Sequence, residues 1–417
     1  MVFGELYMVF GESYVEAMQI GDCPGFALEV VMMEEVLRQF KTEGELRAIR
    51  QNKQGHIHNT FIVEFVSDKS SANTGSLQVR RYILQKLNTS IFEDPAKLMN
   101  NIYLVTTHLK REIEQRPNGI LQKALNIVKT LDDQLYFQDE AFNCWRLYDY
   151  IEDSYTPNEG KSHGISNERH TKEKDCYTSK ESGKLSEIYE SGRAFGNFHE
   201  LLKGFDPLKL EELLPDFHNT PKRYRDLVQA FEQDFYNRAK DAKAEYAYLQ
   251  SLQDLYPKII EAGQSGQLPF KVVHNDAKMS NVLLSTKTGK PLSVIDLDTI
   301  GPGYTPYDFG DAIRSGAATA KEDEADLNKV NFNLENYKSF AAGFLSGSNN
   351  TLSQKEIELL PYGALIITLE QAMRFLTDYL QNDPYYQTSY AQHNLVRCKN
   401  QIKLAQEMQV IWPKLRI

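Results

Sequence analysis

The first part of the chain predicts an amphipathic helix followed by a β-hairpin. Between residues 22 and 50, apolar residues recur at helical spacing, in the stripe Phe26, Val30, Met33, Val36, Leu37 and Phe40. The period then changes, because residues 56–65 alternate and are rich in β-forming side chains, and residues 79–87 form a second such run. A polar stretch, residues 67–76, separates the two runs, so we expect them to pair as a hairpin.

The following segments add a helix and more strands to this region. Residues 97–116 have helical periodicity, whereas residues 120–128 and 134–137 fit short strands or helical turns. Residues 145–151 are aromatic-rich and predict a strand. Residues 22–151 are therefore predicted to form a small, mainly β lobe with at least one long helix.

A change in composition separates this lobe from a helical region. Residues 152–184 are dominated by Ser, Thr, Glu, Lys, Asn and Gly, so they can bury little apolar surface and predict a mobile loop or insertion. Residues 185–417 are mainly helical, with the expected helices at 188–202, 221–262, 331–345, 353–380 and 390–408. One β island, residues 271–284 and 293–298, interrupts them. The pattern predicts an α+β protein of two unequal lobes.

Composition narrows the class of protein. Of the 417 residues, 41% are hydrophobic and 25% charged, as in an ordinary globular protein. The net charge of −10 gives no basic footprint for nucleic acid, and no apolar run approaches the roughly 18 residues of a membrane span. Glu5 and Glu12 interrupt the first apolar residues, so we expect no secretory signal. The four cysteines form no C-x-x-C motif, which favours a reducing, cytoplasmic compartment.

The polar residues of the β island have the spacing of a kinase catalytic loop. Asp276 lies two residues after His274, and Asn281 lies five residues after Asp276. Asp296 ends the next apolar strand, at the place of a metal-binding Asp, although Leu297-Asp298 follow it instead of Phe-Gly. The structural alternative is a polar loop whose side chains only satisfy backbone donors.

Phosphoryl transfer from ATP gives each of these positions a role. Asp276 is predicted to orient and deprotonate the acceptor hydroxyl, and Lys278 to offset charge on the transferring phosphoryl group. Asn281 and Asp296 are predicted to bind Mg²⁺, which prefers oxygen ligands. Asp298 could join them or only cap the next turn.

Two neighbouring residues are interpreted mainly as structural, and the role of a third, Arg314, is left open. His274 is expected to bond backbone near Asp296, and Asp308 to cap the helix that begins there. Arg314 could reach the mouth of the site or pair with an acid.

The nucleotide end is predicted from weaker signals. Gly55 lets the backbone approach ATP, and Asn59 or Thr60 can offer hydrogen bonds to its phosphates. The phosphate-binding position on the second strand could be Gln85 or Lys86, which strand alternation places on opposite faces.

Residues 145–151, with Tyr148 and Tyr150, could form an inter-lobe hinge that offers backbone groups to adenine. An ordinary core strand is the alternative.

The loop from His274 to Asn281, with Asp296, resembles the aminoglycoside phosphotransferase and choline kinase superfamily. More closely, the chain resembles bacterial N-acetylhexosamine 1-kinases in residues 82–88, 145–148, 195–199, 215–223 and 294–314. This resemblance implies a two-lobed protein-kinase-like fold with ATP and Mg²⁺ as cofactors. It also implies phosphorylation of the anomeric hydroxyl of GlcNAc or GalNAc. Residues 152–184 and those before Asp22 have no counterpart in that resemblance.

The segment from Pro215 to Arg223 is the predicted sugar pocket. Its candidate contacts, together with Arg314, are Asp216, His218, Asn219, Thr220 and Arg223. A capped loop entering a helix is the alternative for this segment. Other acceptors (an aminoglycoside, choline, homoserine or a hexose) and a catalytically silent kinase-like binding module remain open, as does the oligomeric state.

Overall fold

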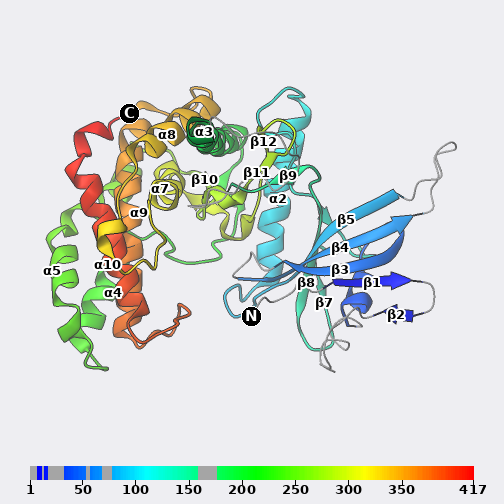
Figure 1. Cartoon of the computed structure of the whole chain (residues 1–417), viewed down its shortest axis with the longest axis horizontal. Coiled ribbons are helices and arrows are strands. Elements are labelled where there is room, and N and C mark those ends of the chain that lie inside the picture. The colour runs from blue at the N-terminus through cyan, green and yellow to red at the C-terminus, as the bar shows by residue number, and fades with distance from the viewer. Residues whose placement is uncertain (1–6, 12–13, 17–31, 53–56, 68–77, 158–175) are drawn as a thin grey trace. The chain divides into compact units, whose positions relative to one another are not determined.

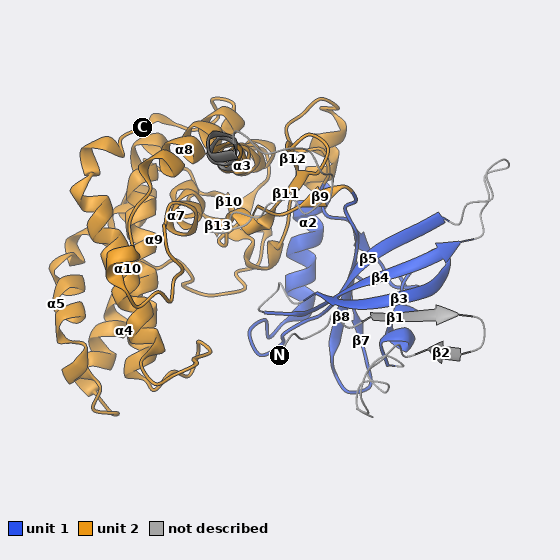
Figure 2. Cartoon of the chain, in the orientation of Figure 1, with its two compact units in different colours: residues 1–107, 124–152 blue, residues 108–123, 153–417 orange. Residues whose placement is uncertain are grey.

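The computed structural model describes residues 7–11, 14–16, 32–52, 57–67, 78–157 and 176–417 (Figure 1). The chain divides into two compact units (Figure 2). The first unit comprises residues 1–107 and 124–152, and the second comprises residues 108–123 and 153–417. Within the described ranges, every helix is too short or too polar to cross a lipid bilayer.

The first unit is built on one antiparallel sheet. Its strands are β1 (Tyr7–Gly11), β2 (Tyr14–Glu16), β3 (Glu45–Asn52), β4 (Asn59–Ser67), β5 (Gln78–Lys86), β6 (Ile127–Val128), β7 (Phe137–Gln138) and β8 (Cys144–Asp149). Their order is β2-β1-β3-β4-β5-β8-β6, and β7 also pairs with β8. The predicted hairpin is confirmed as β4–β5, with Thr60 opposite Gln85, while the polar stretch 68–77 lies outside the described residues. The predicted helix at 97–116 is confirmed as α2 (Pro95–Glu114).

The first predicted helix is only partly correct. Residues 32–37 are helical, and Met33, Val36, Leu37 and Phe40 are buried in one core with residues of β3, β4, β5 and β8. Residues 45–52, however, form strand β3 instead of continuing the helix. The physical reason is Gly44, whose backbone φ of +93° lies in a region that residues other than glycine rarely adopt. Phe26 and Val30 lie outside the described residues.

The second unit is mainly helical. Its helices are α3 (Cys176–Leu201), α4 (Thr220–Gln233), α5 (Lys243–Ser251), α6 (Lys258–Gln264), α7 (Thr305–Gly316), α8 (Leu334–Ser348), α9 (Gln354–Leu380) and α10 (His393–Val410). Strands β9 (Ser154–Tyr155), β11 (Val282–Ser285) and β12 (Pro291–Val294) form one small sheet, and β10 (Lys271–Val273) pairs with β13 (Gly301–Gly303). These two small sheets carry the residues of the predicted β island.

Two predicted segments differ from the structure. The helix expected over 221–262 is three helices, because Asp234 ends α4 in a left-handed conformation and Pro257 precedes α6. The polar segment 152–184 contains β9 near its start, and α3 begins at Cys176. The middle of that segment, residues 158–175, lies outside the described residues.

Helices α3 and α8 pack closely because each presents two glycines spaced four residues apart (Figure 1). A Cβ atom on Gly196 would lie 2.1 Å from the carbonyl oxygen of Phe344, and one on Gly343 would lie 2.0 Å from that of Tyr189. No real Cβ contact is so short, and a backbone carbonyl cannot rotate away as a side chain can. Gly192 and Gly347 make equivalent close contacts. The backbones therefore touch directly, which fixes the position of α3.

We expect Gly196→Ala to lower the free energy of unfolding by about 1–3 kcal/mol, because the added methyl group must push α3 away from α8. Gly204→Ala is the matched control, since nothing lies within 4 Å of a Cβ at that position. It should change stability by less than about 0.5 kcal/mol. Urea titrations of the two variants test this, and equal stability would contradict the close packing.

Candidate active site

The predicted catalytic residues converge at one end of the β11–β12 hairpin. Val282 pairs with Val294, which places Asn281 opposite Ile295 and next to Asp296. The backbone N–H of Ile295 donates to the carbonyl of Asn281 at 2.9 Å. His274 Nε2 donates to the carbonyl of Ile295, also at 2.9 Å, as the sequence predicts for a structural histidine. The two loops that carry the motif are thus tied together by one backbone–backbone bond and one bond from the His274 side chain.

Asp276 is held as a carboxylate beside a cation. Lys278 Nζ lies 2.6 Å from Asp276 Oδ1, and the amide of Asn281 donates to Asp276 Oδ2 at 3.2 Å. Burial alone would raise the pKa of Asp276, but the charge and hydrogen bond of Lys278 outweigh it and lower this pKa. The charge of Asp276 in turn raises the pKa of Lys278. At neutral pH the pair consists of a proton acceptor and a fixed positive charge.

Asn281 and Asp296 present oxygen atoms that fit Mg²⁺. The side-chain nitrogen of Asn281 donates to the carbonyl of Asp276 at 2.8 Å, which leaves its amide oxygen as the ligand atom. Asp296 is exposed and has a left-handed φ of 62°, whereas Asp298 is buried. Among the residues that the structure describes, no three His, Cys, Asp or Glu side chains gather as metal ligands. A site with one or two carboxylates suits Mg²⁺, which takes its remaining ligands from water and substrate phosphates.

Asp308 holds the backbone of the catalytic loop instead of capping a helix. The N-cap of α7 is Tyr304, so the predicted capping role is wrong: Pro306 lies in the first turn and the helix begins earlier. The carboxylate of Asp308 accepts the backbone N–H groups of His274 and Asn275 at 2.7 and 2.8 Å. These two bonds fix the start of the loop.

Helix α3 contributes a partner to the same carboxylate. His199 Nε2 lies 3.0 Å from Asp308 Oδ2, and both side chains are buried. Burial opposes the charged form, but the pair with His199 and the backbone donors outweigh it, so the pKa of Asp308 is lowered. A buried, ionised carboxylate therefore links α7, α3 and the catalytic loop.

The structure gives protein partners to much of the predicted sugar-binding segment. Asn219 caps α4 by accepting the N–H of Lys222, and its amide donates to Asp216. Thr220 is buried and donates to Glu370. Arg223 donates to the carbonyl of Phe217 at 3.3 Å. The contacts of Asn219 and Asp216 thus agree with the alternative interpretation of this segment, a capped loop that enters a helix.

His218 and Arg314 also have acidic partners. His218 Nδ1 lies 2.8 Å from Glu370 Oε1. Arg314 pairs with Asp311 at 3.0 Å and with Glu322 at 2.6 Å, and its charge contributes to the lowered pKa of Asp276. Arg314 therefore pairs with two acids and lies close enough to Asp276 to stabilise its negative charge.

Sequence reasoning missed Glu370 and Arg374 on α9. Arg374 lies over the rings of Phe217, Tyr385 and Tyr386, with its guanidinium carbon 5.4–5.8 Å from the ring centroids. The available signal was an acid directly after the apolar run from Ala364 to Leu369. A charge on the buried face of a helix needs a partner, and such residues gather at functional sites.

Two cavities share Phe217 in their linings. One, of about 330 Å³, is lined by residues that include Asp216, Asn275 and Tyr304. The other, of about 270 Å³, is lined by residues that include Arg223, Arg374, Tyr385 and Tyr386.

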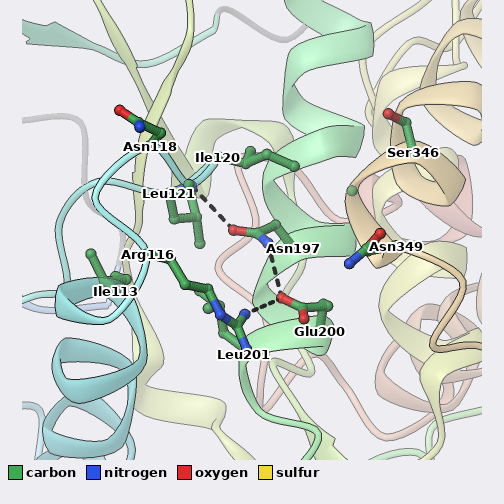
Figure 3. A pocket seen from close by; sticks show the side chains of 12 residues that line it. Ile113, Arg116, Asn118, Ile120, Leu121, Asn197, Glu200, Leu201, Ser346 and Asn349 are labelled. Carbon is green, nitrogen blue, oxygen red and sulfur yellow. Dashed lines mark hydrogen bonds and ion pairs between the residues drawn. The ribbon is translucent and has the colours of Figure 1, made fainter.

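A third pocket, of about 250 Å³, lies among α2, α3 and α8 (Figure 3). Arg116 pairs there with Glu200 at 2.5 Å, and Asn197 donates to the same carboxylate. None of the predicted site residues lines it.

In the first unit, Gln85 and Lys86 have different surroundings. Gln85 donates to Thr60 Oγ1 at 3.0 Å and accepts from the buried Arg146 at 2.9 Å. Lys86 lies over the ring of Trp145, 5.8 Å from its centroid. The cation next to Gln85 is thus an arginine of β8, which sequence alternation within β5 alone does not reveal.

The structure describes three of the four remaining nucleotide candidates. Gly55 lies outside the described residues, and Asn59 is exposed at the start of β4. Tyr148 is buried in β8, and Tyr150 lies under the guanidinium of Arg81 at 4.8 Å.

Replacing Asp308 should be costly because two backbone donors and His199 would lose a buried charge. We expect Asp308→Asn to lower the free energy of unfolding by about 3–5 kcal/mol, since one amide N–H must then face a backbone N–H. Asp326→Asn is the control, because Asp326 is an exposed cap whose role Asn can fill. It should stay within about 0.5 kcal/mol of the parent in urea unfolding. A similar loss in both variants would refute the anchoring role.

Comparison with known proteins identifies a shared family segment and a shared fold. Residues 175–342 match the model of the phosphotransferase enzyme family. A microcompartment-associated aminopropanol kinase is similar over 93% of this chain and 99% of its own, with 16% identity and a TM-score of 0.58. A spectinomycin phosphotransferase matches over 88% and 93% of the two chains, with 13% identity and a TM-score of 0.50. A choline kinase from Cryptosporidium parvum matches over 93% and 98%, with 11% identity and a TM-score of 0.50.

These likenesses confirm the predicted α+β kinase-like fold, with an antiparallel sheet followed by a mainly helical region. The matched family segment includes the catalytic loop and Asp296, so this part of the chain is similar to the phosphotransferase enzyme family.

Proposed function

We propose that this protein is an ATP-dependent kinase that transfers the γ-phosphoryl group to a hydroxyl of a small molecule. The observation that carries the proposal is the convergence of Asp276, Lys278, Asn281 and Asp296 at one end of the β11–β12 hairpin. A binding module without catalysis has no chemical need for all four. The aminopropanol, spectinomycin and choline kinases that share this fold act on small molecules according to their names.

The contacts of these residues support a role for each of them. Asp276 would orient the acceptor hydroxyl and take its proton as the oxygen attacks the γ-phosphorus. Its lowered pKa is compatible with this role, because positioning matters more than basicity for a loose, metaphosphate-like transition state. Lys278 would offset charge on the phosphoryl oxygens. Asn281 and Asp296, with Asp298 as a further candidate, would hold Mg²⁺, which supplies charge neutralisation to the nucleotide phosphates when bound.

Residues of the first unit are proposed to bind the nucleotide. Thr60, Gln85 and Arg146 form a hydrogen-bonded row across β4, β5 and β8. Asn59 and Lys86 face each other at the adjacent register position. The row offers donors of the kind that nucleotide phosphates need.

For the acceptor, we propose an N-acetylhexosamine that is phosphorylated on its anomeric hydroxyl. The resemblance of residues 82–88, 145–148, 195–199, 215–223 and 294–314 to such kinases supports this choice. The cavity lined by Arg223, Arg374, Tyr385 and Tyr386 has a suitable character, because guanidinium groups can donate to sugar oxygens and aromatic rings can pack on a sugar face.

The Asp276→Asn variant tests the kinase assignment. It should lose at least about 10³-fold in kcat, because the amide cannot accept the hydroxyl proton, while Mg·ATP binding is retained. Asp296→Asn should instead raise the Mg²⁺ concentration that half-maximal activity requires. ATP consumption and nucleotide-binding calorimetry distinguish the two effects. Undiminished turnover by Asp276→Asn would remove this residue from the mechanism.

An acceptor screen tests the substrate. With Mg·ATP, we expect turnover on GlcNAc or GalNAc and formation of the sugar 1-phosphate, detected by ³¹P NMR. Glucose and galactose are controls for the acetamido group, and choline, homoserine and an aminoglycoside represent the other acceptor classes. Activity on a non-sugar only would exclude the hexosamine assignment. If the protein consumes no ATP with any of these acceptors, a catalytically silent binding module would be favoured.

A further inference from the structure

The peptide bond that precedes Asp276 is held at both ends by histidines. Its carbonyl, from Asn275, lies 3.2 Å from His218 Nε2. Its N–H, from Asp276, donates to His274 Nδ1 at 3.3 Å. Because the peptide unit is planar, these two contacts define the direction in which the Asp276 side chain leaves the backbone.

The backbone at this point needs such support. Asn275 has a φ of +66°, in the left-handed region that costs free energy for residues other than glycine. Asp308 holds the N–H groups of His274 and Asn275, but it leaves the carbonyl of Asn275 to another partner. That partner is His218.

The hydrogen-bond geometry specifies the protonation of His218. A carbonyl can only accept, so Nε2 must carry a proton to bond Asn275. Glu370 already accepts the hydroxyl of Thr220 at 2.5 Å through Oε2, and its other oxygen faces Nδ1 at 2.8 Å. An ionised Glu370 can also only accept, so Nδ1 carries a proton too. His218 is therefore an imidazolium paired with a carboxylate.

The surroundings favour this charge state. The side chains of His218 and Glu370 are only 8% and 2% exposed. Burial by itself would lower the pKa of His218, but the charge and hydrogen bond of Glu370 outweigh it and raise this pKa above the ordinary value of a histidine. From α7, Asp311 adds a further negative charge, and the ring of Tyr307 packs 5.1 Å from the imidazole. Burial would raise the pKa of Glu370, yet His218 and Thr220 together lower it.

We propose that His218, kept as an imidazolium by Glu370, is a positioning residue that orients the catalytic Asp276 through the carbonyl of Asn275. This role replaces the direct sugar contact that the sequence suggested for His218, since both of its ring nitrogens have protein partners. The inference rests on the proposed kinase function and adds a pH dependence to it. As pH rises through the pKa of His218, the imidazolium loses a proton and one of its two contacts.

Two substitutions at position 218 separate positioning from general stability. The carboxamide of Gln reaches the place of Nε2 and can still donate to Asn275, whereas that of Asn reaches only the place of Nδ1 and Glu370. We expect His218→Asn to lower kcat by about 10²-fold with little change in the KM for ATP. His218→Gln should remain within about tenfold of the parent. Equal losses in the two variants would overturn the proposal.

The pH profile gives a second readout that a merely structural residue would not change. The parent should lose kcat as pH rises above the pKa of His218, and this alkaline limb should be absent in His218→Gln. Glu370→Gln removes the negative charge that stabilises the imidazolium, so its alkaline limb should move to lower pH. An unchanged limb in both variants would overturn the assignment.

Two measurements do not depend on turnover. In ¹⁵N NMR of the parent near pH 6, both ring nitrogens of His218 should show the shifts of an imidazolium, and a neutral ring would refute the charge assignment. Amide hydrogen exchange in the peptide 272–281 should accelerate in His218→Asn but not in His218→Gln. If the parent phosphorylates no acceptor, the kinase proposal fails, whereas these measurements still decide whether His218 holds the loop.

Discussion

The carboxylate of Asp308 is the point from which the candidate active site is held. It binds two consecutive backbone N–H groups at the start of the catalytic loop and pairs with His199 of α3. Such a bond network works only if its helices cannot shift. Helix α3 is fixed by glycine contacts with α8, and α7 is fixed against α9, where a Cβ on Gly310 would lie 2.4 Å from the carbonyl oxygen of Gly363. Backbone packing thus sets the position of a buried charge, and that charge sets the loop.

Alternating charges then keep the site ionised although much of it is removed from water. Asp276 faces Lys278, His218 faces Glu370, and Arg314 faces Asp311. An isolated buried charge would shift its pKa and become neutral, but opposite charges at hydrogen-bonding distance preserve the ionised forms. The lowered pKa values of Asp276 and Glu370 have this origin, whereas hydrogen bonds from His199 and from the backbone lower the pKa of Asp308. The cluster therefore keeps Asp276 as a carboxylate, which is the form that its proposed role as a proton acceptor requires.

Features formed by residues that lie close together along the chain could be predicted from the sequence. The spacing from His274 to Asn281 lies within one loop, and the β4–β5 hairpin follows from alternation in two neighbouring runs. The bond from His274 to the backbone beside Asp296 could also be predicted, although it spans 21 residues. The partners of Asp308 and His218 could not be predicted, because they lie far away along the chain. His218 and Glu370 are 152 residues apart, and their pairing depends on how α4 packs against α9.

The segment from Pro215 to Arg223 both lines two cavities and contacts the catalytic loop, and the sequence alone did not show which residue does which. Phe217 lines both cavities that flank it, whereas the next residue, His218, contacts the catalytic loop. Adjacent residues on a short, capped segment cannot move independently, because Asn219 fixes its end to α4. A ligand that displaces Phe217 would therefore also act on His218 and, through the carbonyl of Asn275, on Asp276. In the proposed kinase, an acceptor bound against Phe217 would thus influence the orientation of Asp276 through this one peptide unit.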